Sequence, residues 1–229
     1  KIMQAPRIRS LLTVGAVTGG LLLAVGMSVA QDESFVIVDD EASIEDLIPL
    51  LSNGQGVAAV EKDDVYMDDR DRKAALRIDA VAGDFQKYNP TIPGWQFDIV
   101  ANPSDEDEFR YITFAWKKEG GSGMQLQLSG EPGGWSHRYH ASANMQDWNP
   151  SIQVTADFPA DWQIHTRDMF VDWGPFVLTG MAFSPSSEDF GIYDHVLLHQ
   201  DEDDPDAAYA VGVRGKVAAA WAAMKRDIR

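Results

Sequence analysis

The chain has 229 residues, of which 45% are hydrophobic, so it can bury one full-sized core and we expect one main domain. Its 36 acidic and 19 basic residues give a formal net charge of −17 at pH 7, and such a field repels phosphate backbones and argues against nucleic acid as a partner. The chain contains no cysteine, which excludes disulfides, thiolate nucleophiles and thiolate metal ligands.

Residues 1–30 combine a basic flank with an apolar run. Leu11 to Ala30 carries no charge, and as a helix it would match the hydrocarbon core of a bilayer, about 30 Å. The small residues before Gln31 are typical of a signal-peptide cleavage site, whereas Gly15 and Gly19 form a packing face found between membrane helices. We favour a retained single-pass anchor, with the N-terminus in the cytoplasm and the rest of the chain in the periplasm or outside the cell.

Residues 31–56 are interpreted as an acidic linker with one short helix. Ser43 followed by Asp46 is typical of an N-cap with an acidic first turn, so we expect a helix from there to about Leu51. Asn53 and Gly54 would end it. This segment is expected to connect the anchor to the domain or to dock beside it.

Residues 57–200 show the alternation of apolar and polar residues that is typical of β-strands. Turn residues separate the runs, as at Asn89-Pro90 and Gly174-Pro175. About eight short strands without a long helical period predict an all-β fold, an antiparallel β-sandwich of jelly-roll type. The runs are KAALRIDAV, GWQFDIVA, RYITFAWKK, MQLQLSG, WQIHTRDMF, FVLTGMAF and IYDHVLLHQ.

The stretch RYITFAWKKEGGSGMQLQLSG is interpreted as two strands of one hairpin around a glycine-rich turn. One face of both strands is apolar and predicts core. The other face carries Tyr111, Thr113, Gln125 and Gln127, and it is uncharged in a very acidic protein. We therefore expect that face to contact a sugar, another subunit or a loop of the same chain.

Residues 201–229 begin with the acidic run DEDDPD and continue as an alanine-rich segment with basic residues toward its end. This composition predicts an acidic turn followed by a C-terminal helix outside the sandwich.

Motifs for chemistry are sparse. His195 and His199 are four apart, but in a strand this separates them by roughly 13 Å, too far to ligate one transition metal. Asp64 and Asp68 lie in an acidic loop and are the candidate ligands of a structural calcium ion, although the loop lacks EF-hand spacing. No nucleophile motif is present, so we expect a protein without catalytic residues and without an organic cofactor.

Aromatic residues give the strongest indication of binding. Trp95 and Trp116 fall on apolar faces and are predicted to lie in the core. Trp135 and Trp148 lie in a loop-rich stretch together with Tyr139, His140 and Asn144. Aromatic planes with amide and imidazole groups suit either sugar rings or a protein interface.

Five stretches together carry a resemblance to a known domain. They are IPGWQFDIV, FRYITFAWKKEGGSGMQLQL, WSHRYHASAN, WQIHTRDMFVDWGPFVLTGMAFSP and GIYDHVLLHQ. The region from about Ala74 to Gln200 resembles an uncharacterised sandwich domain of exported proteins in planctomycete-type bacteria. That domain is similar in outline to carbohydrate-binding jelly rolls, so the resemblance implies a sandwich fold, and it carries no catalytic residues over.

Two functions follow as alternatives. The first is a non-catalytic accessory subunit of a membrane protein assembly, of which a respiratory or photosynthetic complex is the kind of host, docked through the anchor and the sandwich. The second is a secreted module that binds a carbohydrate or an envelope glycan. The first hypothesis rests on the anchor, and the second rests on the jelly-roll pattern and on Trp135 and Trp148.

Overall fold

The computed structural model describes residues 34–68, 72–81, 86–185 and 189–203. The expected anchor with Gly15 and Gly19, and the helix expected after residue 203, lie outside these residues. Among the described residues, no helix is long and apolar enough to span a membrane.

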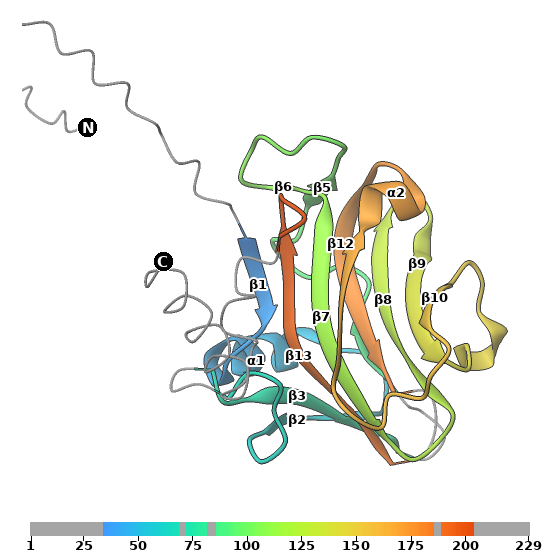
Figure 1. Cartoon of the computed structure of the whole chain (residues 1–229). Coiled ribbons are helices and arrows are strands. Elements are labelled where there is room, and N and C mark those ends of the chain that lie inside the picture. The colour runs from blue at the N-terminus through green and yellow to red at the C-terminus, as the bar shows by residue number, and fades with distance from the viewer. Residues whose placement is uncertain (1–33, 69–71, 82–85, 186–188, 204–229) are drawn as a thin grey trace, which may run out of the picture. The chain divides into compact units, whose positions relative to one another are not determined.

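Two β-sheets face each other across one core, which confirms the predicted sandwich (Figure 1). Sheet A has the order β11-β7-β13-β3-β2, and β1 also pairs with β13. Sheet B has the order β10-β9-β8-β12-β5-β6, and β4 also pairs with β12. Most neighbours are antiparallel, while β9 with β10 and β5 with β6 are parallel. The strands of sheet A are β1 (Ser34–Val38), β2 (Val57–Glu61), β3 (Ala75–Asp79), β7 (Tyr111–Glu119), β11 (Gln163–Asp168) and β13 (Phe190–His199). Those of sheet B are β4 (Lys87–Asn89), β5 (Phe97–Ile99), β6 (Glu108–Phe109), β8 (Gly123–Glu131), β9 (Gly134–Ser142), β10 (Ile152–Thr155) and β12 (Phe176–Ser184).

The predicted hairpin is wrong, because β7 and β8 belong to different sheets. β7 pairs with β11 and β13 in sheet A, and β8 pairs with β9 and β12 in sheet B. The alternation was nevertheless correct, since the apolar residues of both strands are buried in the core between the sheets. The consequence is that Tyr111 and Thr113 do not share a face with Gln125 and Gln127. The apolar residues concerned are Ile112, Phe114, Trp116, Met124, Leu126 and Leu128.

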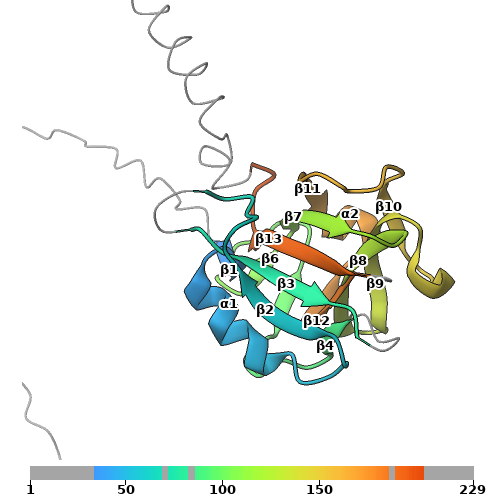
Figure 2. The same cartoon turned by 90° about the horizontal axis from the view of Figure 1, so that it is seen from below.

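The segment expected as a linker is part of the sandwich. β1 pairs with the second half of β13, and α1 (Glu41–Leu47) packs beside β1 and β2 (Figure 2). Asp40 caps this helix in a capping box with Ser43, so the helix begins three residues earlier than predicted, and Ser43 is N3 rather than the N-cap. Ile44 and Leu47 are buried in the core, which explains why the segment folds onto the sheet.

Three short helical turns complete the described chain. They are η1 (Ile48–Leu50), η2 (Met145–Asp147) in the connection from β9 to β10, and α2 (Met169–Trp173) directly after β11. The first turn continues α1, whereas η2 lies over sheet B and positions the residues that follow it.

Candidate functional site

A row of four residues crosses the outer face of sheet B. Tyr88 on β4 is opposite Ala182 on β12, Ala182 is opposite Gln127 on β8, and Gln127 is opposite Arg138 on β9. Because cross-strand partners share one face of a sheet, the four side chains point to the same side. Three strand spacings give this row a length of about 14 Å.

Hydrogen bonds fix the polar members of the row. Gln127 Oε1 accepts a hydrogen bond from Arg138 Nε at 2.9 Å. Gln127 Nε2 donates to Ser184 Oγ at 2.9 Å and to Gln86 Oε1 at 3.3 Å. Gln127 is only 2% exposed, so its amide is held in one orientation below the surface.

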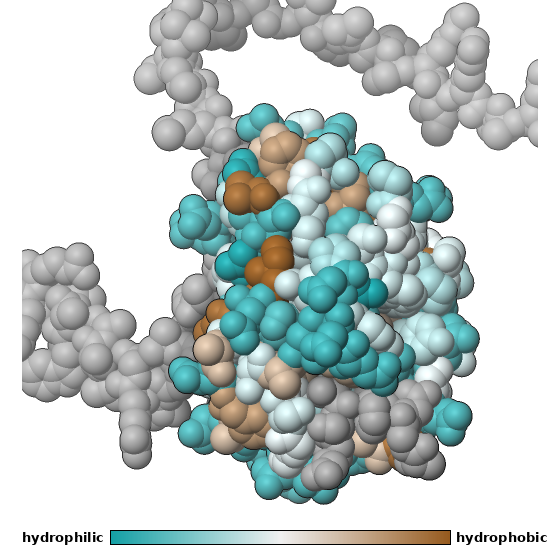
Figure 3. Space-filling view, turned by 90° about the vertical axis from the view of Figure 1, so that its right-hand side faces the viewer, coloured by the Kyte–Doolittle hydropathy of each residue, from teal (hydrophilic) through white to brown (hydrophobic). Residues whose placement is uncertain are grey.

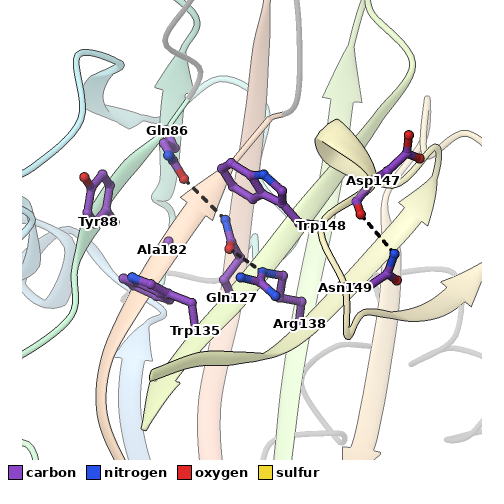
Figure 4. Close-up of a pocket in the computed structure, with 9 residues that line it drawn as sticks. All are labelled: Gln86, Tyr88, Gln127, Trp135, Arg138, Asp147, Trp148, Asn149 and Ala182. Carbon is purple, nitrogen blue, oxygen red and sulfur yellow. Dashed lines mark hydrogen bonds between the residues drawn. The ribbon is translucent and has the colours of Figure 1, made fainter. Parts of the chain in front are cut away.

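Two tryptophans stand beside this row and form a pocket of about 430 Å³. Trp135 is at the start of β9 and contacts the Tyr88 ring edge to face at 5.7 Å. Trp148 follows η2, and its ring lies 5.7 Å from the Arg138 guanidinium carbon. Figure 4 shows the Gln127 amide between the two indoles. The other lining residues are Gln86, Asp147, Asn149 and Ala182.

The loop that carries Trp148 is held in a strained but well-bonded conformation. Gln146 and Asp147 adopt left-handed backbone angles, with φ of 48° and 54°, at a cost of roughly 1 kcal/mol or more for each non-glycine residue. Asn144 accepts a hydrogen bond from Gln125 Nε2 and donates one to the Trp148 carbonyl at 2.9 Å. These contacts fix Trp148 over the sheet before any ligand arrives.

Arg138 is the cation of the pocket. Nη1 donates to the Pro150 carbonyl at 3.2 Å, and partial burial lowers the pKa of the guanidinium, which stays charged. Asp147 is the acidic residue of the lining, and Figure 4 shows its carboxylate pointing away from Arg138.

The structure separates the eight residues that the sequence indicated for binding. Gln127, Trp135 and Trp148 line the pocket. Gln125 and Asn144 lie beneath the Trp148 loop and support it.

The remaining three lie elsewhere. His140 is on the outer face of sheet B, and its Nδ1 is 2.7 Å from Ser151 Oγ. Tyr139 faces the core, where its hydroxyl donates to Asp172 at 2.8 Å and burial raises its pKa well above the usual range. Tyr111 is on sheet A, stacked on His199.

Sequence reasoning missed six of the nine residues that line the pocket. Arg138 alternates with Ser136 and His140 in the stretch WSHRYH, which gave its face but not its neighbours. Tyr88 and Gln86 reach the pocket only because β4 pairs with β12. No local pattern in the sequence shows that Tyr88 and Gln86 lie beside Arg138, since the pairing joins strands that are far apart in the chain.

The calcium candidates do not converge. Lys117 Nζ and Trp162 Nε1 donate to Asp64, and Asp68 forms an ion pair with Lys73 at 3.1 Å. In the part of the chain that the structure describes, no group of three or more histidine or acidic residues is placed to hold a metal ion.

No protein-family model matches the chain, and no curated protein matches its sequence. Among solved structures, the chain is similar to the glycoside hydrolase domain of Endo-D from Streptococcus pneumoniae, with a TM-score of 0.37 and 11% identity over 67% of this chain and 22% of that one. It is also similar to a family 11 carbohydrate-binding module from Clostridium thermocellum in complex with a mixed-linked tetrasaccharide, with a TM-score of 0.34 and 7% identity over 64% of this chain and 84% of that one. A third similarity is to an exo-β-agarase, with a TM-score of 0.32 and 14% identity over 71% of this chain and 25% of that one.

Proposed function

We propose that this chain is a non-catalytic carbohydrate-binding module that acts outside the cytoplasm and binds a glycan in the pocket on sheet B. The observation that supports this most strongly is the placement of Trp135 and Trp148 on either side of the Gln127 amide. An indole offers a flat apolar surface to the C–H face of a sugar ring, and the Arg138 guanidinium and the exposed Asn149 amide of the lining are suited to bind the hydroxyls around the ring.

The shape of the pocket fits a chain of sugars rather than a single ring. The row from Tyr88 to Arg138 runs across four strands and is about 14 Å long. Because its side chains are already hydrogen-bonded or stacked on each other, little conformational entropy is lost on binding. A preformed row of this length suits an extended oligosaccharide that lies across the strands.

The acidic groups of the lining support binding rather than hydrolysis. Glycosidases generally place two carboxyl groups about 5 to 10 Å apart on either side of the scissile bond. Among the described residues that line the pocket, Asp147 is the acidic member, and its carboxylate points away from the floor. We therefore propose recognition without cleavage.

Docking onto a membrane assembly has less support. The anchor on which that hypothesis rests lies outside the described residues. On the face seen in Figure 3, the described apolar residues form small, separate patches within a mostly hydrophilic surface. Obligate interfaces between subunits are generally larger and more hydrophobic than such patches, so the described part of this face does not favour that hypothesis.

A glycan array tests the proposal. The unmodified chain and a W135A/W148A variant are applied to the same array, and we expect the variant to lose at least about tenfold in affinity because each indole is a main contact surface. Trp162→Ala is the matched control, since Trp162 hydrogen-bonds Asp64 beside Tyr66 and does not line the pocket.

Two results would oppose the proposal. One is no binding by the unmodified chain to any glycan on an array that includes plant, algal and bacterial envelope polysaccharides. The other is equal loss of binding in the pocket variant and in the Trp162 control. Thermal melting of all three proteins shows whether a loss comes from unfolding.

A further inference from the structure

We infer that the glycan is acidic and that Arg138 binds its carboxylate or sulfate group. This inference rests on the proposed function and names the class of sugar that the pocket selects. It comes from the distribution of ion pairs in the described part of the chain.

Five arginines lie within the described residues, and four of them have a carboxylate within 4.0 Å. Arg72 is paired with Asp39, Arg77 with Asp79 and Glu61, Arg110 with Asp168, and Arg167 with Asp172. Arg138 is the exception: no described carboxylate lies within this distance of it.

The exception is informative because acidic residues are so abundant. The chain has 36 acidic and 19 basic residues, so acidic side chains outnumber basic ones almost two to one. Arg138 is nevertheless partly buried beside Trp148, where an unpaired charge is costly. A partly buried guanidinium with no counter-ion among the described residues is best accounted for by a counter-ion that the ligand brings.

The geometry of Arg138 leaves one edge of its guanidinium for that ligand. Nε is bonded to Gln127 Oε1 and Nη1 to the Pro150 carbonyl, whereas Nη2 makes no hydrogen bond to a described residue. The first two bonds fix the plane of the group. Nη1 and Nη2 can then donate together to two oxygens of one anionic group, which is the favoured geometry for carboxylate and sulfate.

The negative charge of the whole protein does not prevent this contact. At physiological ionic strength the Debye length is about 8 Å, so exposed carboxylates beyond that distance are largely screened. A hydrogen-bonded ion pair inside a pocket is screened much less. Asp147 is the described carboxylate in the lining, and Figure 4 shows it pointing away from Arg138.

Binding measurements with charge-matched ligands test this inference. The ligands are oligouronates (galacturonate and mannuronate oligomers) and their carboxyl-reduced forms, together with sulfated galactan oligomers and their desulfated forms. We expect the unmodified chain to bind one charged form at least about tenfold more tightly than its neutral counterpart. The pair that shows this preference identifies the group as carboxylate or sulfate.

Variants assign the preference to Arg138. Arg138→Gln should bind the charged and neutral forms of that pair equally, and Arg138→Lys should keep part of the preference, because lysine retains the charge but not the two-pronged geometry. Arg77→Gln is the control, since Arg77 lies on β3 of sheet A and is paired internally. It should keep the full preference.

Three outcomes overturn the inference. If the unmodified chain binds charged and neutral forms equally, the glycan-binding proposal stands and the acidic class is wrong. If Arg138→Gln retains the preference, Arg138 is not the residue that binds the anion. If the unmodified chain binds no oligosaccharide at all, the proposed function fails and this inference fails with it.

Discussion

Asn144 acts on the pocket without lining it. Its side chain joins Gln125 on β8 to the Trp148 carbonyl and so holds the indole in place. We expect Asn144→Ala to weaken glycan binding by about three- to tenfold, because Trp148 must then be ordered when the ligand binds. Titration calorimetry measures this.

The control for Asn144 is Gln153→Ala. Gln153 also bonds a backbone carbonyl, that of Ser142, but it is exposed on β10 and lies outside the pocket lining. An equal effect of both substitutions, or no effect of Asn144→Ala, would contradict the positioning role.

Tyr139 belongs to the core and not to the binding surface. Its hydroxyl donates to Asp172, which also receives two hydrogen bonds from Arg167. Tyr139→Phe should lower the free energy of unfolding by about 1 to 2 kcal/mol, because one bond to a buried charged group is lost. Urea denaturation measures this, and glycan affinity should not change. Reduced affinity with unchanged stability would show that Tyr139 serves the ligand instead.

His165 makes the stability of the fold depend on pH. It lies on β11 beside Phe114 and Trp116, at ring distances of 5.6 and 5.5 Å, and burial lowers its pKa to about 4. The unfolded chain therefore binds a proton below about pH 6.5 that the folded chain does not take up until about pH 4. The contribution of His165 to the free energy of unfolding is therefore fully present above about pH 6.5, and it is lost as the pH falls toward 4.

His165→Phe should remove that loss. Between pH 7 and 4.5, the unmodified chain should lose roughly 2 kcal/mol relative to the variant in urea denaturation. Asp194, whose burial raises its pKa to about 7, titrates in the same range in both proteins, so their difference isolates His165. Parallel stability curves for the two proteins would show that the imidazole is not responsible.

At the scale of elements, β12 changes its edge partner at one glycine. β5 pairs with residues 176–178 of β12, and β4 pairs with residues 181–183. The segment that leads from β4 to β5 therefore leaves β12 near Gly180. A Cβ on Gly180 would lie 2.1 Å from the Asn89 carbonyl oxygen and 2.6 Å from that of Pro90. No side chain fits there without moving the backbone that leads from β4.

Gly180→Ala should therefore destabilise the sandwich by about 1 to 3 kcal/mol and weaken glycan binding, because it displaces β4 and with it Tyr88. Gly94→Ala is the control: its φ of +86° adds backbone strain, but a Cβ there meets nothing within 4 Å. Circular dichroism melts and binding of both variants check this. If Gly180→Ala and Gly94→Ala changed glycan binding equally, the close contact of Gly180 with the end of β4 would not be what positions Tyr88 in the pocket.

The sequence predicted which faces of the strands are buried but not how the strands pair. In RYITFAWKK and MQLQLSG, the alternation correctly indicated Phe114 and Leu126 as core. The same alternation of apolar and polar residues occurs in a hairpin and in two strands that face each other across a sandwich. The connection of three residues, 120–122, reaches up to about 14 Å, which exceeds the spacing of about 10 Å between packed sheets. Nothing local therefore distinguishes the two arrangements.

For the whole molecule, the pocket exists only through long-range register. Trp135 and Trp148 could be indicated from the sequence, because they stand among turn residues and polar hydrogen bonders. Tyr88, Gln127 and Arg138 form one row because β4, β12, β8 and β9 pair in that order. Such pairing is decided by the packing of both sheets against one core, which no stretch of sequence contains.

An NMR titration with a glycan selected on the array tests the central claim most directly. It follows the indole N–H signals of the seven tryptophans as the glycan is added. Single Trp→Phe variants assign the signals. We predict that the Trp135 and Trp148 signals shift with the ligand, while those of the core residue Trp116 and of Trp162 beside Tyr66 stay in place. Shifts confined to Trp162, or no shift of Trp135 and Trp148 at a glycan concentration that saturates binding, would contradict a site on the outer face of sheet B.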